Sequence, residues 1–237
     1  MDNMSRLIHM IWIGSPLPLN KYAPGIQSFL TLNPGEIHTE SKCNRFFFPE
    51  HQIYLWLDHP ESVQVTGEKI VVKDVKEEEF LLADLVERST NFAQKADILR
   101  LEIVYRHGGV YVDIDSTALR SLGQFNIFFQ EIFQKTFFPG PVFQRSFLSF
   151  RPSNWTQSSE QYKFLDRGSH LGSAGLENNV FGFGRESEFL KYAMEALREN
   201  FPLETATLYK TGPYFLKEAF LQYPYHNDIN LIGTPSQ

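Results

Sequence analysis

The sequence contains a single cysteine, no long apolar run and no excess of basic residues. Because Cys43 is alone, no intramolecular disulfide can form, which fits a reducing compartment. The apolar runs are far shorter than the roughly 20 residues of a membrane-spanning helix, so we expect no transmembrane segment. The first residues also lack the apolar region of a signal peptide. We therefore expect a cytoplasmic protein, or one delivered into another cell's cytosol by a route that the sequence does not display.

The charge balance argues against nucleic acid as a partner. The chain has 22 Lys and Arg against 28 Asp and Glu, a formal net charge of -6, and its basic residues are scattered. A protein that follows a phosphate backbone normally carries a basic stripe. A nucleotide is still compatible with this composition, because a bound metal or a local cation can hold a diphosphate on an acidic protein.

The length and hydrophobic patterning predict one α/β domain. A chain of 237 residues with 42% hydrophobic residues can bury a full core without division. Apolar runs bounded by turn residues predict strands at 7–13, 52–57, 69–75 and 110–114, alternating with helices at 24–32, 76–87, 92–107, 186–200 and 214–222. This alternation favours a mostly parallel sheet in the first half. Many of the 22 Phe lie within 125–150, where we expect aromatic core filling or a β-rich lobe.

The helix expected at 92–107 has the clearest boundaries. Asn91 can cap its start, and Gly108-Gly109 can end it. Asp97 and Arg100 are three residues apart, so they share one face of this helix. They form either an intrahelical ion pair or a pair that holds a ligand at the end of the following strand.

Two carboxylates follow that strand directly. Asp113 and Asp115, at i and i+2, are expected on the same side of the strand end, where they repel each other unless a cation lies nearby. Hard oxygen ligands suit Mg²⁺ or Mn²⁺, which share their coordination with substrate phosphates. Ligands of open α/β sheets bind at the carboxyl ends of strands. A D-x-D pattern alone is weak, and its plain alternative is a solvated strand end.

The context of the two carboxylates resembles a known family. The stretches 96–100 (ADILR) and 105–115 (YRHGGVYVDID) are similar to the signature of the DXD-containing sugar transferases. That group includes initiating α-1,6-mannosyltransferases, α-1,4-N-acetylglucosaminyltransferases and the glucosylating domains of clostridial toxins. The opening 8–14 (IHMIWIG) and the stretch ending in 54–58 (YLWLD) resemble two further blocks of it. Asn178-Asn179 and 211–213 (TGP) resemble weaker downstream blocks.

This resemblance implies a GT-A fold, a single nucleotide-binding α/β domain with a mixed, mostly parallel central sheet flanked by helices. It implies a retaining transferase with a nucleotide-sugar donor, Mn²⁺ or Mg²⁺, and a glycan or protein acceptor. Residues 7–117 would form the donor-binding half and 118–237 the acceptor side. The implied donor-binding residues are Trp12, Asp97, Arg100, Tyr111, Asp113, Asn178 and Asn179; the implied metal ligands are Asp115 and Asp113; and the implied catalytic residues are Asp113, Asp115 and Arg100.

One part of the family pattern is missing. Members of the family often close the donor site with a C-terminal segment that contains a Trp and a further metal or phosphate ligand. No Trp follows Trp155 in this sequence. Residues 226–228 (HND) offer replacement ligands for that closing segment.

Two other functions fit parts of the sequence. Residues 113–117 (DIDST) match the D-x-D-x-T pattern of HAD-type phosphohydrolases, in which Asp113 would be the nucleophile. That chemistry also needs a downstream acidic pair, and Asp166 and Asp228 are each isolated from other acidic residues. A non-catalytic module that binds a nucleotide sugar or glycan would use the same side chains as an enzyme.

Overall fold

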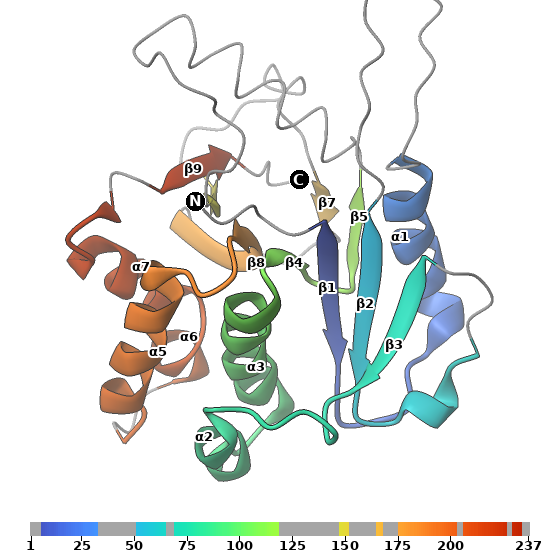
Figure 1. Ribbon diagram of the computed structural model, residues 1–237, viewed down its shortest axis with the longest axis horizontal. Helices are drawn as coiled ribbons and strands as arrows, with labels where there is room; N and C mark the ends of the chain where they lie inside the picture. The colour runs from blue at the N-terminus through green and yellow to red at the C-terminus, as the bar shows by residue number, and fades with distance from the viewer. Residues whose placement is uncertain are drawn as a thin grey trace, which may run out of the picture.

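The computed structural model describes residues 6–32, 51–64, 69–118, 147–151, 165–167, 175–202, 206–226 and 229–233 (Figure 1). Within these ranges the central sheet has seven strands in the order β3-β2-β1-β4-β8-β6-β9. The pairs β3–β2, β2–β1, β1–β4 and β6–β9 are parallel, whereas β4–β8 and β8–β6 are antiparallel. The expected mixed, mostly parallel sheet flanked by helices is confirmed.

The parallel half of the sheet consists of β1 (Leu7–Trp12), β2 (Gln52–Leu57), β3 (Ile70–Asp74) and β4 (Gly109–Val112). Leu7 pairs with Gln52 and Trp12 with Leu57, so β1 and β2 run in register over their full length. Because the four strands are parallel, their carboxyl ends lie at one edge of the sheet. The chain leaves β1 at Trp12 and β4 at Val112 toward this edge, where ligands of such sheets bind.

The remaining strands come from the second half of the chain. They are β8 (Gly175–Phe183), which pairs with β4, then β6 (Phe147–Arg151) and β9 (Asn230–Gly233). A separate two-stranded sheet joins β5 (Ser116–Ala118) to β7 (Leu165–Arg167). Since β5 begins one residue after Asp115, this small sheet anchors the segment that follows the D-x-D sequence.

Side chains alternate between the two faces of the sheet, as the pleat of a strand requires. On one face, Ile8, Met10 and Leu55 pack against α1 (Leu19–Leu32). On the other face, Ile11, Trp56 and Tyr111 belong to a second core that includes α2 (Ala83–Arg88), α3 (Phe92–His107), α5 (Glu188–Asn200) and α7 (Pro213–Gln222) (Figure 1). The sheet is therefore a middle layer with helices on both sides.

Helix α3 lies at the centre of the molecule and has the expected boundaries. The side chain of Asn91 accepts a hydrogen bond from the backbone N–H of Gln94 at 2.9 Å, which caps the first turn. Gly108 and Gly109 end the helix with φ angles of 65° and 100°, which favour glycine. The chain can therefore turn from α3 directly into β4.

A buried histidine holds this turn against the neighbouring strands. Trp56 Nε1 donates to His9 Nδ1 at 3.1 Å, so the proton of the neutral ring sits on Nε2 and is donated to Gly108 O at 2.8 Å. Burial lowers the pKa of His9 to about 3, which keeps the ring neutral. His9 is thus a core residue with both ring nitrogens satisfied.

Several expected elements differ from the structure at their ends, and three of these differences matter here. Helix α1 begins at Leu19 rather than 24, with Pro24 inside it. The helix expected at 76–87 is reduced to α2, because the segment before Leu82 forms turns whose Leu81 and Leu82 N–H groups bind the buried Glu102 carboxylate. The strand expected at 110–114 ends at Val112. Residues 125–146 of the phenylalanine-rich stretch lie outside the described residues.

Candidate active site

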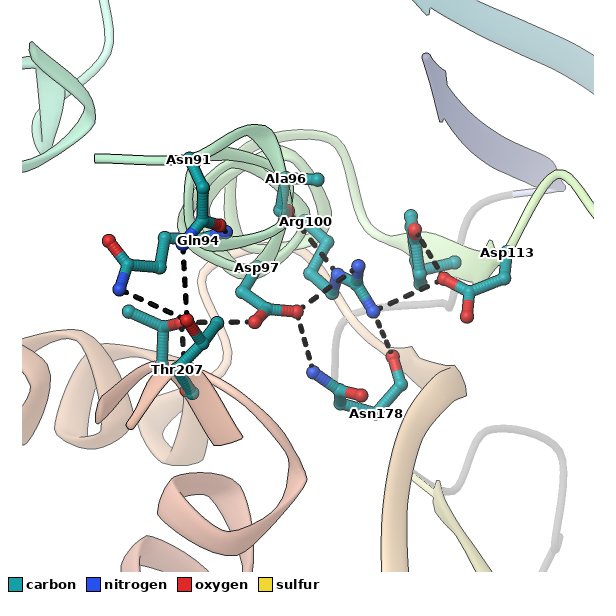
Figure 2. Close-up of polar contacts among 10 residues, drawn as sticks. Asn91, Gln94, Ala96, Asp97, Arg100, Asp113, Asn178 and Thr207 are labelled. Carbon is teal, nitrogen blue, oxygen red and sulfur yellow. Dashed lines mark hydrogen bonds and ion pairs between the residues drawn. The ribbon is translucent and has the colours of Figure 1, made fainter. Parts of the chain in front are cut away.

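The residues of the candidate site come from four separate parts of the fold. Asp97 and Arg100 lie in the middle of α3, and Asp113 and Asp115 follow β4. Asn178 is on β8, and Thr211 lies between α6 (Thr207–Lys210) and α7. Figure 2 shows Arg100 between Asp97 and Asp113, with Asn178 below it. Residues up to 114 positions apart in sequence are therefore joined in one polar network.

Arg100 is the centre of this network. Its Nη2 lies 3.2 Å from Asp97 Oδ1, and its Nη1 lies 3.2 Å from Asp113 Oδ1. The same Nη1 donates to the backbone oxygen of Asn178 at 2.8 Å, and Nε donates to Ala96 O at 3.3 Å. The guanidinium carbon lies 4.5 Å from the centre of the Tyr111 ring, a cation–π distance. The planar guanidinium therefore links α3, β4 and β8 at the sheet edge.

Asp97 is held at both carboxylate oxygens. Oδ1 accepts from Asn178 Nδ2 at 2.8 Å in addition to its contact with Arg100. Oδ2 accepts from the hydroxyl of Thr211 at 3.0 Å. Burial raises the pKa of Asp97 to about 6, and the nearby Arg100 charge opposes that rise. An ionised Asp97 therefore depends on these donors near neutral pH.

Asp113 is connected to the strand that precedes it. Tyr111 is buried, and its hydroxyl donates to Asp113 Oδ1 at 2.7 Å. The backbone N–H of Asp113 donates to Asn179 O at 2.8 Å, and that of Ser116 donates to Asp113 O at 3.0 Å. The second of these bonds closes a tight turn over residues 113–116. The expectation that the two carboxylates lie along a strand is wrong, because the strand pairing with β8 ends at Val112.

Charges around Arg100 favour its ionised form. Burial alone would lower the pKa of Arg100, but Tyr111, Asp113, Asp97 and Asp115 together raise it above its usual value. Burial also raises the pKa of Tyr111 well above its usual value, so its hydroxyl keeps its proton and acts as a donor. The half-buried Asp113 and the exposed Asp115 add negative charge at the solvent side of this network.

The donor groups at this turn suit a hard divalent cation that is shared with a phosphate. Asp113 and Asp115 offer carboxylate oxygens within one turn, which Mg²⁺ and Mn²⁺ accept. Among the described residues no third His, Cys, Asp or Glu joins them in a metal-holding group. The other coordination positions would therefore belong to water and to a phosphorylated ligand, which is the usual arrangement for these ions.

Two more predicted donor-binding residues lie near this edge of the sheet. Trp12 ends β1, its Nε1 donates to Ser15 O at 3.0 Å, and its ring centre lies 5.0 Å from that of Tyr22 on α1. Asn179 is buried on β8. Their roles toward a donor are still predictions. Residues 227 and 228, suggested as replacement ligands, lie outside the described residues, and the His226 ring contacts Tyr223 O at 2.9 Å.

Thr211 was not predicted as a site residue. Its sequence block, 211–213, resembles the family only weakly. Threonine is uncharged, so the residue type alone does not indicate a binding or catalytic role. The fold places its buried hydroxyl on Asp97. The sequence signal at this position is a threonine directly before a Gly-Pro pair. That pair predicts the start of a helix, and it does not predict a contact between Thr211 and Asp97.

Residues 26–137 match the protein family described as "Glycosyltransferase sugar-binding region containing DXD motif", and this stretch includes Asp97, Arg100, Asp113 and Asp115. The matched stretch is slightly less than half of the chain, and this part of the protein is similar to DXD-motif glycosyltransferases. Within the described ranges, no helix has the length and apolar character needed to cross a membrane.

One curated relative shares part of the sequence. It is "Subversion of eukaryotic traffic protein A" of Legionella pneumophila, 28% identical over 116 residues. The match covers 47% of this chain but only 17% of the relative, so this chain corresponds to a small part of that protein.

Several solved structures share the fold. The "PaToxG Glycosyltransferase" superposes with a TM-score of 0.58 at 16% identity, covering 93% of this chain and 70% of that one. The ligand-free glycosyltransferase domain of the YGT toxin gives 0.55 at 12% identity, covering 98% and 80%. Its UDP-bound form gives 0.52 at 13% identity with the same coverage.

Proposed function

We propose that this glycosyltransferase is a retaining, metal-dependent enzyme that moves a sugar from a nucleotide-sugar donor to a hydroxyl of a glycan or protein. The observation that supports this most is the continuous line of contacts Asp97–Arg100–Asp113 at the carboxyl edge of the sheet, two residues before the exposed Asp115. UDP is the favoured nucleotide, since a toxin domain of similar fold binds it. A GDP-sugar is the alternative donor.

In this proposal each group of site residues binds a different part of the nucleotide-sugar donor. Asp115 and Asp113 hold Mn²⁺ or Mg²⁺, which when bound neutralises charge on the departing diphosphate. Asp97 and Arg100 hold the sugar, whereas Trp12 and Tyr111 lie on the nucleoside side. Asn178 and Asn179 complete the donor site from β8. Residues 7–117 form the donor-binding half of a single domain over 1–237, and 118–237 the acceptor side.

The transfer step requires one bond to break and one to form. The bond between the anomeric carbon and the β-phosphate oxygen breaks, and the acceptor oxygen bonds to the same face of that carbon. The acceptor proton passes to the departing phosphate oxygen. Arg100 is fixed by two carboxylates and a carbonyl oxygen, so it can orient the donor without reorganising in the transition state. The described residues suggest no protein nucleophile, and this direct front-face route needs none.

The relatives support a proposed site of action. The similar toxin domains and the Legionella relative named for subversion of eukaryotic traffic favour action in a cytosol, either the cell's own or that of another cell. No nucleic-acid partner is proposed, because the net charge is -6.

The test is a panel of UDP- and GDP-sugars with Mn²⁺, scored by release of nucleoside diphosphate and by thermal shift. Wild-type protein should release UDP from at least one donor, and Asp115→Asn should abolish release while keeping the fold. Full activity of Asp115→Asn in the presence of a chelator would refute the metal role. Release of inorganic phosphate from simple phosphate esters, with no release from sugars, would favour the phosphohydrolase alternative. Binding without any release would favour the non-catalytic module.

A further inference from the structure

Thr211 lies in the short turn between α6 and α7, far in sequence from the other site residues. It is 2% exposed, and its hydroxyl donates to Asp97 Oδ2 at 3.0 Å. The same hydroxyl lies 3.4 Å from Thr207 O, one helical turn earlier. Since Asp97 is also buried, the contact is shielded from water, where a charge-assisted hydrogen bond is strongest.

The contacts of Asp97 show what this hydroxyl contributes. Asn178 and Arg100 both occupy Oδ1, at 2.8 Å and 3.2 Å. Among the described residues Thr211 is the one donor to Oδ2. Contacts at Oδ1 alone leave the carboxylate able to turn about that oxygen, whereas a third contact at Oδ2 fixes its plane. Thr211 therefore determines the direction in which Oδ2 faces.

An ionised carboxylate can accept about four hydrogen bonds, two at each oxygen. Three of the acceptor positions of Asp97 are used by Arg100, Asn178 and Thr211. One position on Oδ2 is left for a hydroxyl donor from a ligand. A sugar ring offers such hydroxyls, and a nucleoside diphosphate without a sugar offers none at this end.

We propose that Thr211 is a positioning residue that fixes Asp97 so that Oδ2 accepts a hydroxyl of the transferred sugar. The inference rests on the proposed function, because it needs a nucleotide-sugar donor held at Asp97. It assigns to the α6–α7 turn a part in distinguishing a nucleotide sugar from the bare nucleotide. In this proposal the metal and the phosphates bind at the turn at 113–116, whereas the hydroxyl of Thr211 contacts Asp97 and Thr207.

The neighbouring Thr207 provides a matched control. Its hydroxyl oxygen accepts from Asn91 Nδ2 and from Gln94 Nε2, both at 3.2 Å, and so joins α6 to the first turn of α3 (Figure 2). Thr207 makes the same kind of helix-to-helix contact as Thr211, but none with Asp97. Replacing it tests the loss of packing between α6 and α3 without loss of the Asp97 contact.

The experiment compares Thr211→Val, Thr211→Ser and Thr207→Val with wild type. For each, calorimetry with Mn²⁺ measures the Kd for UDP and for the sugar donor that wild type hydrolyses fastest among UDP-glucose, UDP-galactose and UDP-N-acetylglucosamine. Steady-state hydrolysis gives KM and kcat. Valine keeps the shape of threonine but leaves Oδ2 without its donor, whereas serine keeps the hydroxyl.

We expect Thr211→Val to weaken UDP-sugar binding by about tenfold, the size expected when a hydrogen bond to a buried charge is lost, and to leave the Kd for UDP unchanged. Thr211→Ser should restore the preference for the sugar donor, and Thr207→Val should keep it. An equal loss of UDP and UDP-sugar binding in Thr211→Val would overturn the inference and assign Thr211 a structural role, as would an unchanged preference. If wild type binds UDP with Mn²⁺ but no sugar donor, the proposed function fails first and the inference with it.

Discussion

Arg100 Nη1 and Asp113 Oδ1 lie 3.2 Å apart, and this contact joins the helix before the D-x-D sequence to the turn that contains it. Asp113 is therefore fixed from two sides, by Arg100 and by the Tyr111 hydroxyl at 2.7 Å. Asp115, two residues later, is exposed, whereas Asp113 is half-buried. The two carboxylates therefore differ in burial, although the sequence presents them as a symmetric pair.

Arg100→Lys should lower kcat/KM for the sugar donor by about 100-fold. A lysine keeps the charge but cannot reach Asp97, Asp113 and the Asn178 oxygen together, because it lacks the planar fork of arginine. The measurement is donor hydrolysis with Mn²⁺, normalised to the folded fraction from circular dichroism.

Arg106→Lys is the matched control for Arg100→Lys. Arg106 lies on the same helix and pairs with Glu102 at 2.8 Å and Glu78 at 3.1 Å, away from the site. Its replacement should lower the melting temperature and leave kcat/KM per folded molecule unchanged. If both variants lost activity equally, Arg100 would have a role in folding only.

Asp113→Asn and Asp115→Asn should differ in stability, although both abolish transfer. Asn at 113 removes the negative charge beside Arg100 in a half-buried position, at a cost of about 1–3 kcal/mol in the free energy of unfolding. Asn at 115 replaces an exposed side chain, where changes are usually within about 0.5 kcal/mol. Urea unfolding of the metal-free proteins measures both values. Equal destabilisation by the two substitutions would contradict the asymmetry seen in the structure.

The sequence predicted helix α3 and strand β2 with their bounds, because local signals determine both. Asn91 and the glycines after His107 set the ends of α3 through side-chain capping and positive φ angles. The segment before α2 was predicted wrongly as helix, because its N–H groups are satisfied by Glu102 from another element. A local sequence pattern does not predict a hydrogen bond between residues 20 positions apart, such as Leu82 and Glu102.

The same limit applies to the site. Asp97, Arg100, Asp113 and Asp115 are near one another in sequence, on a helix and in the turn after the following strand, so a motif could identify them. Thr211 reaches Asp97 only because α6 packs on the start of α3 through Thr207. Its place in the network therefore depends on tertiary structure that periodicity and turn residues do not encode.

Gly25→Ala should weaken the site although it improves helix propensity. A Cβ at Gly25 on α1 would lie 2.7 Å from the backbone oxygen of Ser116 and 3.7 Å from that of Ile114, on either side of Asp115. Alanine is more favourable than glycine in a helix by about 1 kcal/mol. The new Cβ would, however, press on the backbone oxygen of Ser116, which cannot move aside as a flexible side chain can. We expect the turn to shift and Mn²⁺-dependent UDP affinity to fall about tenfold, a loss typical of misplaced site groups.

Gln27→Ala serves as the control for Gly25→Ala, since Gln27 is exposed on the same helix. It should leave UDP affinity at the wild-type value when both are measured by calorimetry with Mn²⁺. A Gly25→Ala protein with wild-type affinity and a higher melting temperature would show that α1 does not constrain the turn.

The pH dependence of stability should reveal the buried His9. Its pKa is about 3 in the folded protein and about 6.5 in an unfolded chain, so the unfolded state binds more protons between these values. The stability that His9 contributes is present above about pH 6.5 and is lost as the pH falls toward 3. Asp97 acts in the opposite sense, because its raised pKa of about 6 makes the folded state bind the extra proton between about pH 3.8 and 6.

The two effects partly cancel in wild type, so a non-titrating replacement is needed to separate them. Glutamine at position 9 can accept from Trp56 and donate to the Gly108 oxygen, as the neutral imidazole does. The free energy of unfolding of His9→Gln, followed by urea titration from pH 4 to pH 8, should lose less stability on acidification than wild type. The difference between the two curves should widen steadily below about pH 6.5. Parallel curves would mean that His9 can take up a proton inside the folded core, which the Trp56 and Gly108 contacts do not allow.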